Sequence, residues 1–156
     1  MVSSVATDKM ACRQKLQMFD HDPGATSAKL CSPDGGTTIN YLDMREYTSL
    51  LVAAMLTVPG TGGSITKVEI VASADAAFTS PVVIKDSGAV AADATGDYVV
   101  AECTAEEIAQ AGTDNGVDLR YAAARITMSA NDAEACVAYL ANPRYPQDGL
   151  TATTIA

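Results

Sequence analysis

Short apolar runs separated by turn residues recur along most of the chain. Polar and apolar residues alternate in 64–72 (SITKVEIVA), so that Lys67 and Glu69 lie on the face opposite to Val68. This period of two predicts a half-buried β-strand. Shorter runs of the same kind predict further strands at residues 81–85, after Pro81, and 97–103.

Residues 46–58 (EYTSLLVAAMLTV) form the longest mostly apolar segment. A helix is possible there, because Leu50, Ala53 and Ala54 would line one face. However, Tyr, Thr and Val flank the run, and Pro-Gly-Thr-Gly-Gly follows it. This punctuation favours a buried strand that ends in a turn.

Two further runs lie near the end of the chain. Residues 119–129 (LRYAAARITMS) alternate well, and residues 134–141 (EACVAYLA) form a second strand-like run, with a turn signal at Asn131 and Asp132 between them. The pattern predicts an antiparallel hairpin with a connection of about five residues.

One short helix is predicted after residue 103. Thr104 with Glu107 three residues later is a capping-box signature, and Glu106 and Glu107 both suit the positive end of the helix dipole. Helix capping therefore explains this acid pair better than catalysis does. Gly112 is predicted to end the helix.

Residues 73–88 (SADAAFTSPVVIKDSG) contain one of the two phenylalanines of the chain. The Asp75 carboxylate is predicted to cap a turn, which returns Phe78 to the core. Burial of that ring stabilises the fold by roughly 1.5–3 kcal/mol. The alternative is an exposed Phe78 that binds a partner.

Residues 1–40 lack periodicity and contain turn signals at 21–24 and 32–36. We expect an extended N-terminal arm over 1–36, with one short strand around Gln14–Phe19. A disordered tail and an arm ordered by a neighbouring subunit are both open. The strands predict a mainly β fold, an antiparallel β-sandwich over residues 37–145, followed by a C-terminal tail at 146–156.

Composition and net charge argue against several classes of function. The 156 residues suit one domain, and the net charge of −9 disfavours nucleic acid and anionic membranes as partners. Aromatic residues are only 5% of the chain and Trp is absent, which is few for a sugar-binding module. The run from Leu50 to Leu56 is too short to span a bilayer. The first residues lack the apolar region of a secretory signal, so we expect synthesis in a reducing cytoplasm.

Cysteine spacing gives no metal site. The four cysteines form no C-x-x-C pair and stand apart from the single histidine, and their spacing supports no particular disulfide. Cys103 and Cys136 lie in apolar runs and are predicted to be small buried hydrophobic residues. The other two are Cys12 and Cys31.

Several other clusters of residues lack the pattern that a functional site requires. Gly35-Gly36 and residues 60–63 lack the phosphate-loop pattern. A lone histidine without a clear partner makes a nucleophile triad improbable, and Asp20, His21 and Asp22 fit a solvated turn better than a metal site. The scattered aspartates lack calcium-loop spacing, and three arginines suit salt bridges. These residues are Asp93, Asp97, Asp114 and Asp118, and Arg120, Arg125 and Arg144. We therefore predict no catalytic residue, no metal and no cofactor, and hence a protein that is not an enzyme.

About half of the chain, from Thr66 to Tyr139, resembles a known family. The segments TKVEIVASADAAFTSPVVIKDSG, DYVVAECTAEEI and LRYAAARITMSANDAEACVAYL are similar to small virion proteins of tailed bacteriophages, the capsid cement or decoration proteins. The S-x-D-x-x-F turn and the R-Y-x-x-x-R strand are also similar to discoidin-like jelly rolls. The resemblance implies a jelly-roll-like sandwich that binds the outer capsid surface.

As implied by the resemblance, the partners would be the major capsid protein and further copies of this chain, often as a homotrimer, in the virion. An N-terminal arm would lie across neighbouring subunits, and repeated weak contacts would add up. A head–tail connector, tail or fibre component is the alternative within this class. A discoidin-like module that binds a carbohydrate or cell-surface ligand is the alternative of another class.

Overall fold

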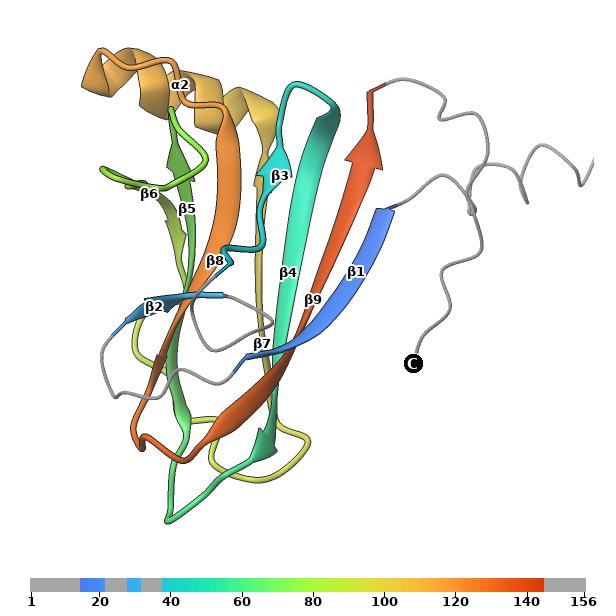
Figure 1. Cartoon of the computed structure of the whole chain (residues 1–156), viewed down its shortest axis with the longest axis vertical. Coiled ribbons are helices and arrows are strands. Elements are labelled where there is room, and N and C mark those ends of the chain that lie inside the picture. The colour runs from blue at the N-terminus through green and yellow to red at the C-terminus, as the bar shows by residue number, and fades with distance from the viewer. Residues whose placement is uncertain (1–14, 22–27, 32–37, 145–156) are drawn as a thin grey trace, which may run out of the picture.

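The computed structural model describes residues 15–21, 28–31 and 38–144, and it is mainly β (Figure 1). Two antiparallel sheets face each other, which confirms the predicted antiparallel β-sandwich. The first sheet has the order β1-β9-β4-β7 and the second the order β2-β8-β5-β6, with β3 also paired to β8. The jelly-roll form of the sandwich stays a prediction.

The bounds of the elements follow the sequence pattern closely. The first sheet contains β1 (Lys15–His21), β9 (Glu134–Pro143), β4 (Tyr47–Val58) and β7 (Tyr98–Thr104). The second contains β2 (Lys29–Leu30), β3 (Leu42–Asp43), β8 (Tyr121–Met128), β5 (Ile65–Ser73) and β6 (Val82–Asp86). The apolar run at 46–58 is thus a strand and not a helix.

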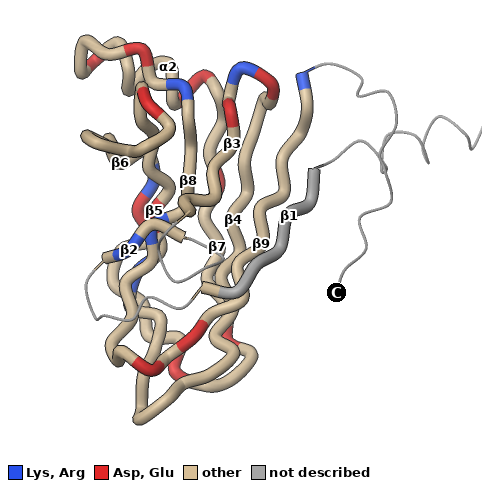
Figure 2. The backbone as a smooth tube through the Cα atoms, in the orientation of Figure 1, with Lys and Arg blue, Asp and Glu red and all other residues tan. Residues whose placement is uncertain are grey.

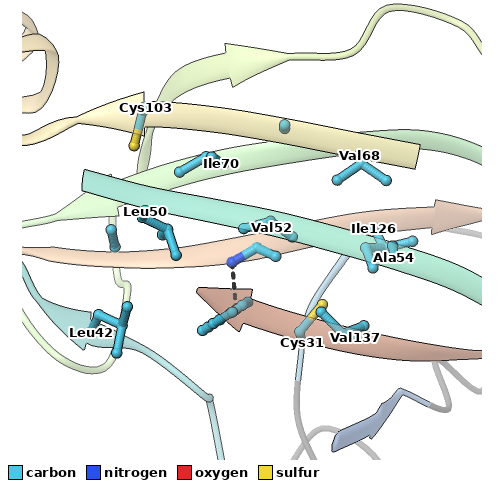
Figure 3. Packing of buried hydrophobic residues seen from close by; sticks show 14 of the residues in the cluster. Cys31, Leu42, Leu50, Val52, Ala54, Val68, Ile70, Cys103, Ile126 and Val137 are labelled. Atoms are coloured by element: carbon cyan, nitrogen blue, oxygen red, sulfur yellow. Dashed lines mark hydrogen bonds between the residues drawn. The ribbon is translucent and has the colours of Figure 1, made fainter. Parts of the chain in front are cut away.

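The core lies between the two sheets and is built largely from small and β-branched residues (Figure 3). Val52 and Val137 from the first sheet pack in the same cluster as Val68 and Ile126 from the second. Among the described residues, Tyr139 is the largest side chain that is fully buried. Its hydroxyl accepts a hydrogen bond from the Ala124 backbone N–H at 2.6 Å and donates to the Asn40 carbonyl at 3.1 Å. Tyr139 therefore links β9 to the opposite sheet.

The predicted hairpin between 119–129 and 134–141 is wrong, although both strands exist. β8 pairs with β2, β3 and β5 in the second sheet, whereas β9 pairs with β1 and β4 in the first. The connection crosses between the sheets and is held by the loop before β5. Asp132 accepts hydrogen bonds from the Thr61 backbone N–H and hydroxyl, both at 3.0 Å. Polar and apolar residues alternate in the same way whether the second strand pairs with the first or lies in the facing sheet. The pattern therefore could not distinguish these two arrangements.

Part of the segment assigned to an N-terminal arm belongs to the sheets. β1 lies at one edge of the first sheet, in register with β9 from Lys15↔Ala141 to His21↔Ala135. The short β2 pairs with β8, and Cys31 after it is buried in the core. The strand expected at Gln14–Phe19 is thus found at Lys15–His21. Residues 1–14, 22–27, 32–37 and 145–156, which include most of the expected arm and the whole expected tail, lie outside the described residues.

The helix α2 (Ala105–Asn115) confirms the capping box. The Glu107 backbone N–H donates to the Thr104 hydroxyl, and the Glu107 carboxylate accepts from the Thr104 N–H at 2.9 Å. The prediction that Gly112 ends the helix is wrong, because the helix continues to Asn115. Gly116, with φ of 68°, is the C-cap. Gly112 is buried, and a Cβ there would lie 2.6 Å from the Val117 carbonyl oxygen, so the position needs glycine for lack of space.

The turn around Phe78 forms as predicted. The Asp75 carboxylate accepts hydrogen bonds from the Ala77 N–H at 2.9 Å and from the Thr79 hydroxyl at 3.2 Å. Phe78 is buried, so the alternative of an exposed binding ring is wrong. The ring, however, joins a small cluster with Val71 and Ala123, separate from the main core.

Candidate docking surface

The central part of the outer face of the first sheet, on β4, β7 and β9, is apolar except for one acid. Alternate side chains on β4, β7 and β9 point away from the core, and the strand register arranges them in three rows. Tyr98, Met55 and Cys136 form one row, Val100, Ala53 and Ala138 the next, and Glu102, Leu51 and Leu140 the third. We call the eight apolar members the apolar face: Leu51, Ala53, Met55, Tyr98, Val100, Cys136, Ala138 and Leu140.

Three large side chains of the apolar face are exposed, and Leu51 and Leu140 are half-buried. Tyr98 is 69% exposed, Val100 45% and Met55 40%. The sheet continues beyond β9 onto β1, whose backbone register pairs Leu16 with Leu140 and Met18 with Ala138. A contiguous apolar patch on a sheet is unusual for a monomer and typical of an interaction surface.

The outer face of the second sheet differs, because charged side chains cover part of it. Glu69 is nearly buried and lies 2.7 Å from Arg125 and 3.2 Å from Lys67, which also pairs with Asp86 at 2.7 Å. Burial alone would raise the pKa of Glu69, but the hydrogen bonds from Arg125 and Lys67 outweigh it and hold the pKa below its usual value. The side chains of this ion-pair network therefore cover that part of the outer face of the second sheet.

An aromatic cluster covers another part of the same outer face. The ring of Tyr41 stacks edge-on against Tyr121 at 5.1 Å and lies 6.2 Å from Phe78. The Arg120 guanidinium lies over the Tyr121 ring at 4.8 Å and donates through Nε to Asp43 at 2.9 Å. That hydrogen bond lowers the pKa of Asp43, so the pair stays ionised at neutral pH. Charged and aromatic side chains thus cover parts of the outer face of the second sheet, whereas in the described part of the chain no such side chains cover the apolar face.

One end of the sandwich is acidic. The segments 57–64, 89–97 and 129–134 contain no Lys or Arg, and they contribute Asp93, Asp97, Asp132 and Glu134. They lie together at the lower end in Figure 2, which is marked by red segments. We call this end the acidic pole. It adjoins the apolar face, because Tyr98 directly follows Asp97.

The three arginines singled out in the sequence all make contacts within the chain. Arg120 and Arg125 form the predicted salt bridges, with Asp43 and Glu69. Arg144 instead donates a hydrogen bond from Nε to the Tyr47 carbonyl at 3.1 Å. These residues hold β3, β5 and the end of β9 in place.

The other residues considered as metal ligands are not brought together by the fold. Asp93 and Asp97 lie in the loop before β7, whereas Asp114 is inside α2 and Asp118 pairs with Arg45 at 3.0 Å. His21 is buried at the end of β1, and the side chains of Asp20 and Asp22 are outside the described part. Within the described ranges no group of three or more His, Cys, Asp or Glu side chains is arranged to hold a metal ion.

Glycine-rich residues 60–63 serve the loop structure. Gly63 packs so closely against the Pro59 carbonyl and Ala133 that a Cβ would not fit. Gly35-Gly36 lies outside the described residues. Among the described helices, none is long and apolar enough to cross a bilayer.

The cysteines occupy different environments. Cys103 is buried, as predicted, and burial raises the pKa of its thiol to about 12, so the thiol is protonated and unreactive. Burial likewise raises the pKa of Cys31. Cys136 was predicted to be buried, but it is only half-buried, because it belongs to the outward row of β9.

Sequence reasoning missed the apolar face, although a signal was present. In 50–56, 98–101 and 135–141, apolar residues occupy both alternating positions. In an antiparallel sheet that pattern indicates strands covered on both sides. The sequence did not show that these three strands are neighbours, so their outward residues were not recognised as one surface.

Comparisons with known proteins give no family assignment. No model of a known protein family matches the chain, and no curated protein sequence matches it.

Proposed function

We propose that this chain is a structural virion protein that binds the outer surface of a tailed-bacteriophage capsid and stabilises the shell. The observation that carries the proposal is the apolar face, which no described segment covers, whereas ion pairs and aromatic rings cover part of the other outer face. Such a surface suits adhesion. The resemblance of residues 66–139 to capsid decoration proteins supplies the kind of partner.

The strand pairing also supports the jelly-roll form that the resemblance implies. β1 pairs with β9, β2 with β8, β4 with β7 and β5 with β6, so that early strands pair with late ones in a nested series. A nested series is what results when one long antiparallel ribbon is folded over on itself. The pairs β4·β9 and β5·β8 then join the ribbon into two sheets.

A partner surface that is apolar at its centre and basic at one margin would match this molecule. The apolar face would be buried on docking, and the acidic pole would meet the basic margin. The chain itself is acidic, so an anchored layer of copies would also keep particles dispersed. Many copies on one shell turn modest single contacts into firm attachment.

Binding of the purified protein to expanded empty capsids tests the proposal. The wild-type chain is expected to bind and to raise the temperature at which the capsids rupture. Val100→Glu, which places a charge on the apolar face, is expected to weaken binding by at least about 30-fold, because an unpaired charge in an interface costs about 2 kcal/mol or more.

Val83→Glu is the matched control, since Val83 is 42% exposed on β6 of the second sheet, against 45% for Val100. It is expected to bind like the wild type. Equal loss by both variants, or no capsid binding by the wild type, would contradict the proposal. Binding to a glycan array without capsid binding would favour a carbohydrate-binding module, and attachment at the tail would favour a tail or connector component.

A further inference from the structure

The free edge of β7 lacks the features that protect the two edges of the second sheet, β2 and β6. Natural edge strands avoid unwanted pairing by lysine, proline, bulges or short length. β6 has Pro81 before it, Lys85 within it and a register shift against β5. β2 has only two residues, one of them Lys29. In contrast, Tyr98–Ala101 of β7 (YVVA) contains neither lysine nor proline, and its register with β4 is regular.

The backbone of β7 is arranged to accept another strand. The Leu56 N–H donates to the Asp97 carbonyl at 2.9 Å, which fixes the phase of the β4·β7 ladder. Since hydrogen-bonded and non-hydrogen-bonded pairs alternate, Val99 and Ala101 bond to β4. The N–H and C=O groups of Tyr98 and Val100 therefore point to the open edge.

A groove runs along this edge. Its lining is apolar or small except for one acid, and consists of Val90, Ala91, Ala92, Gly96, Asp97, Tyr98, Val99 and Val100. The wall opposite β7 is fixed to the second sheet, because the Ile65 N–H donates to the Ala92 carbonyl and the Val90 N–H to the Thr66 carbonyl, both at 2.9 Å. The groove thus lies between two anchored segments, with Asp93 and Asp97 in the loop that joins them.

We propose that the edge of β7 accepts an extended segment of the binding partner as an added strand. The segment would be apolar at alternate positions, to fill the groove, and would carry Lys or Arg at the end that reaches Asp93 and Asp97. A second copy of this chain fits less well, because each copy carries a net charge of −9. The inference rests on the proposed function only for the partner's identity as a capsid protein.

Proline substitutions test the backbone contact directly. Val100→Pro removes an N–H that faces the groove and leaves the β4 ladder intact, whereas Val100→Thr keeps the N–H and the β-branched shape. Glu102→Pro is the matched proline on the same side of β7, beyond the groove lining. If strand addition occurs, Val100→Pro binds about tenfold or more weakly, and the other two bind like the wild type.

The probe is a synthetic peptide of alternating Val and Thr with Lys at one end, added to ¹⁵N-labelled protein at up to millimolar concentration. Amide shifts are expected to be confined to residues 90–92 and 96–101 in the wild type, and a Glu-ended peptide is expected to bind more weakly. The wild-type map decides the question even if Val100→Pro fails to fold. No shifts, shifts elsewhere, or equal binding by Val100→Pro and Val100→Thr would overturn the proposal.

The same variants, assayed on empty capsids, separate this inference from the proposed function. Peptide binding at β7 without any capsid binding would contradict the capsid role and leave the strand acceptor standing. Capsid binding that Val100→Pro leaves unchanged would overturn the strand acceptor in that complex and leave the capsid role standing.

Discussion

At the scale of single residues, local chemistry was readable from the sequence where a side chain acts on its own backbone. Asp75 caps the turn that holds Phe78, and Thr104 caps α2, both as predicted. What the sequence did not show is how strained the turn is, since Phe78 adopts φ of 53°, a left-handed conformation that is uncommon for a residue with a side chain. Burial of the ring against Val71 and Ala123 offsets that cost.

The buried carboxylate Glu69 gives a pH-dependent prediction at this scale. Its folded-state pKa is lowered, so its contribution to stability is present above its unfolded pKa of about 4.3 and is lost as the pH falls through the folded value. Glu69→Gln is expected to lower the free energy of unfolding by about 3 kcal/mol at pH 7, because Arg125 is left beside a neutral group. Its loss of stability on acidification should be smaller than that of the wild type.

Urea unfolding between pH 7 and pH 3 measures both effects. Glu134→Gln, at an exposed position on the acidic pole, is the control and should change the free energy of unfolding by less than about 0.5 kcal/mol. A Glu69→Gln protein with the wild-type pH profile would show that the ion pairs with Lys67 and Arg125 do not stabilise the fold.

At the scale of elements, strands and the helix were predictable because periodicity and caps are local. The pairing was not, because β8 and β9 are close in sequence yet lie in different sheets, and nothing in their alternation reveals which sheet each joins. Gly112 was misassigned for a similar reason. Glycine is needed at position 112 because the backbone at Val117 packs against it. In the sequence, a glycine placed there for packing looks the same as a glycine that ends a helix.

A substitution at Gly112 reverses the usual effect of glycine in a helix. Gly→Ala inside a helix ordinarily stabilises by about 1 kcal/mol. Here the new methyl group would lie 2.6 Å from the Val117 carbonyl oxygen, so Gly112→Ala is expected to destabilise by roughly 1–3 kcal/mol. Thermal unfolding followed by circular dichroism measures this, with the exposed Glu106→Ala as the helix control. A raised melting temperature for Gly112→Ala would mean that the C-terminal turn yields readily.

At the scale of the whole molecule, the two outer faces and the two ends are chemically different. The apolar face depends on three strands that meet only in the folded sheet, so composition alone concealed it. The net charge could be read from the sequence. The clustering of acidic residues at the acidic pole could not, because only the fold brings residues 57–64, 89–97 and 129–134 together (Figure 2). This asymmetry is expected to orient the molecule on a partner, because the apolar face would make the contact and the acidic pole would be attracted to basic groups.

The acidic pole is expected to govern how fast the protein attaches. Glu134→Gln, which removes a charge outside the β7 groove, should slow association with empty capsids about twofold at low salt and leave dissociation nearly unchanged, because exposed charges act mainly on encounter. The difference should shrink above about 0.15 M salt, where the Debye length is about 8 Å. Stopped-flow light scattering at several salt concentrations checks this, and a faster rate for the variant would point to an acidic target.

The last of the described strands, β9, lies between β1 and β4 and carries Tyr139, the side chain that links the two sheets. During synthesis, β1 and β4 therefore leave the ribosome long before the strand that joins them exists. The apolar segments of 46–58 and 98–101 must wait in solution until residue 143 has emerged. Emergence of residues 134–143 is then the step that allows the first sheet to be completed.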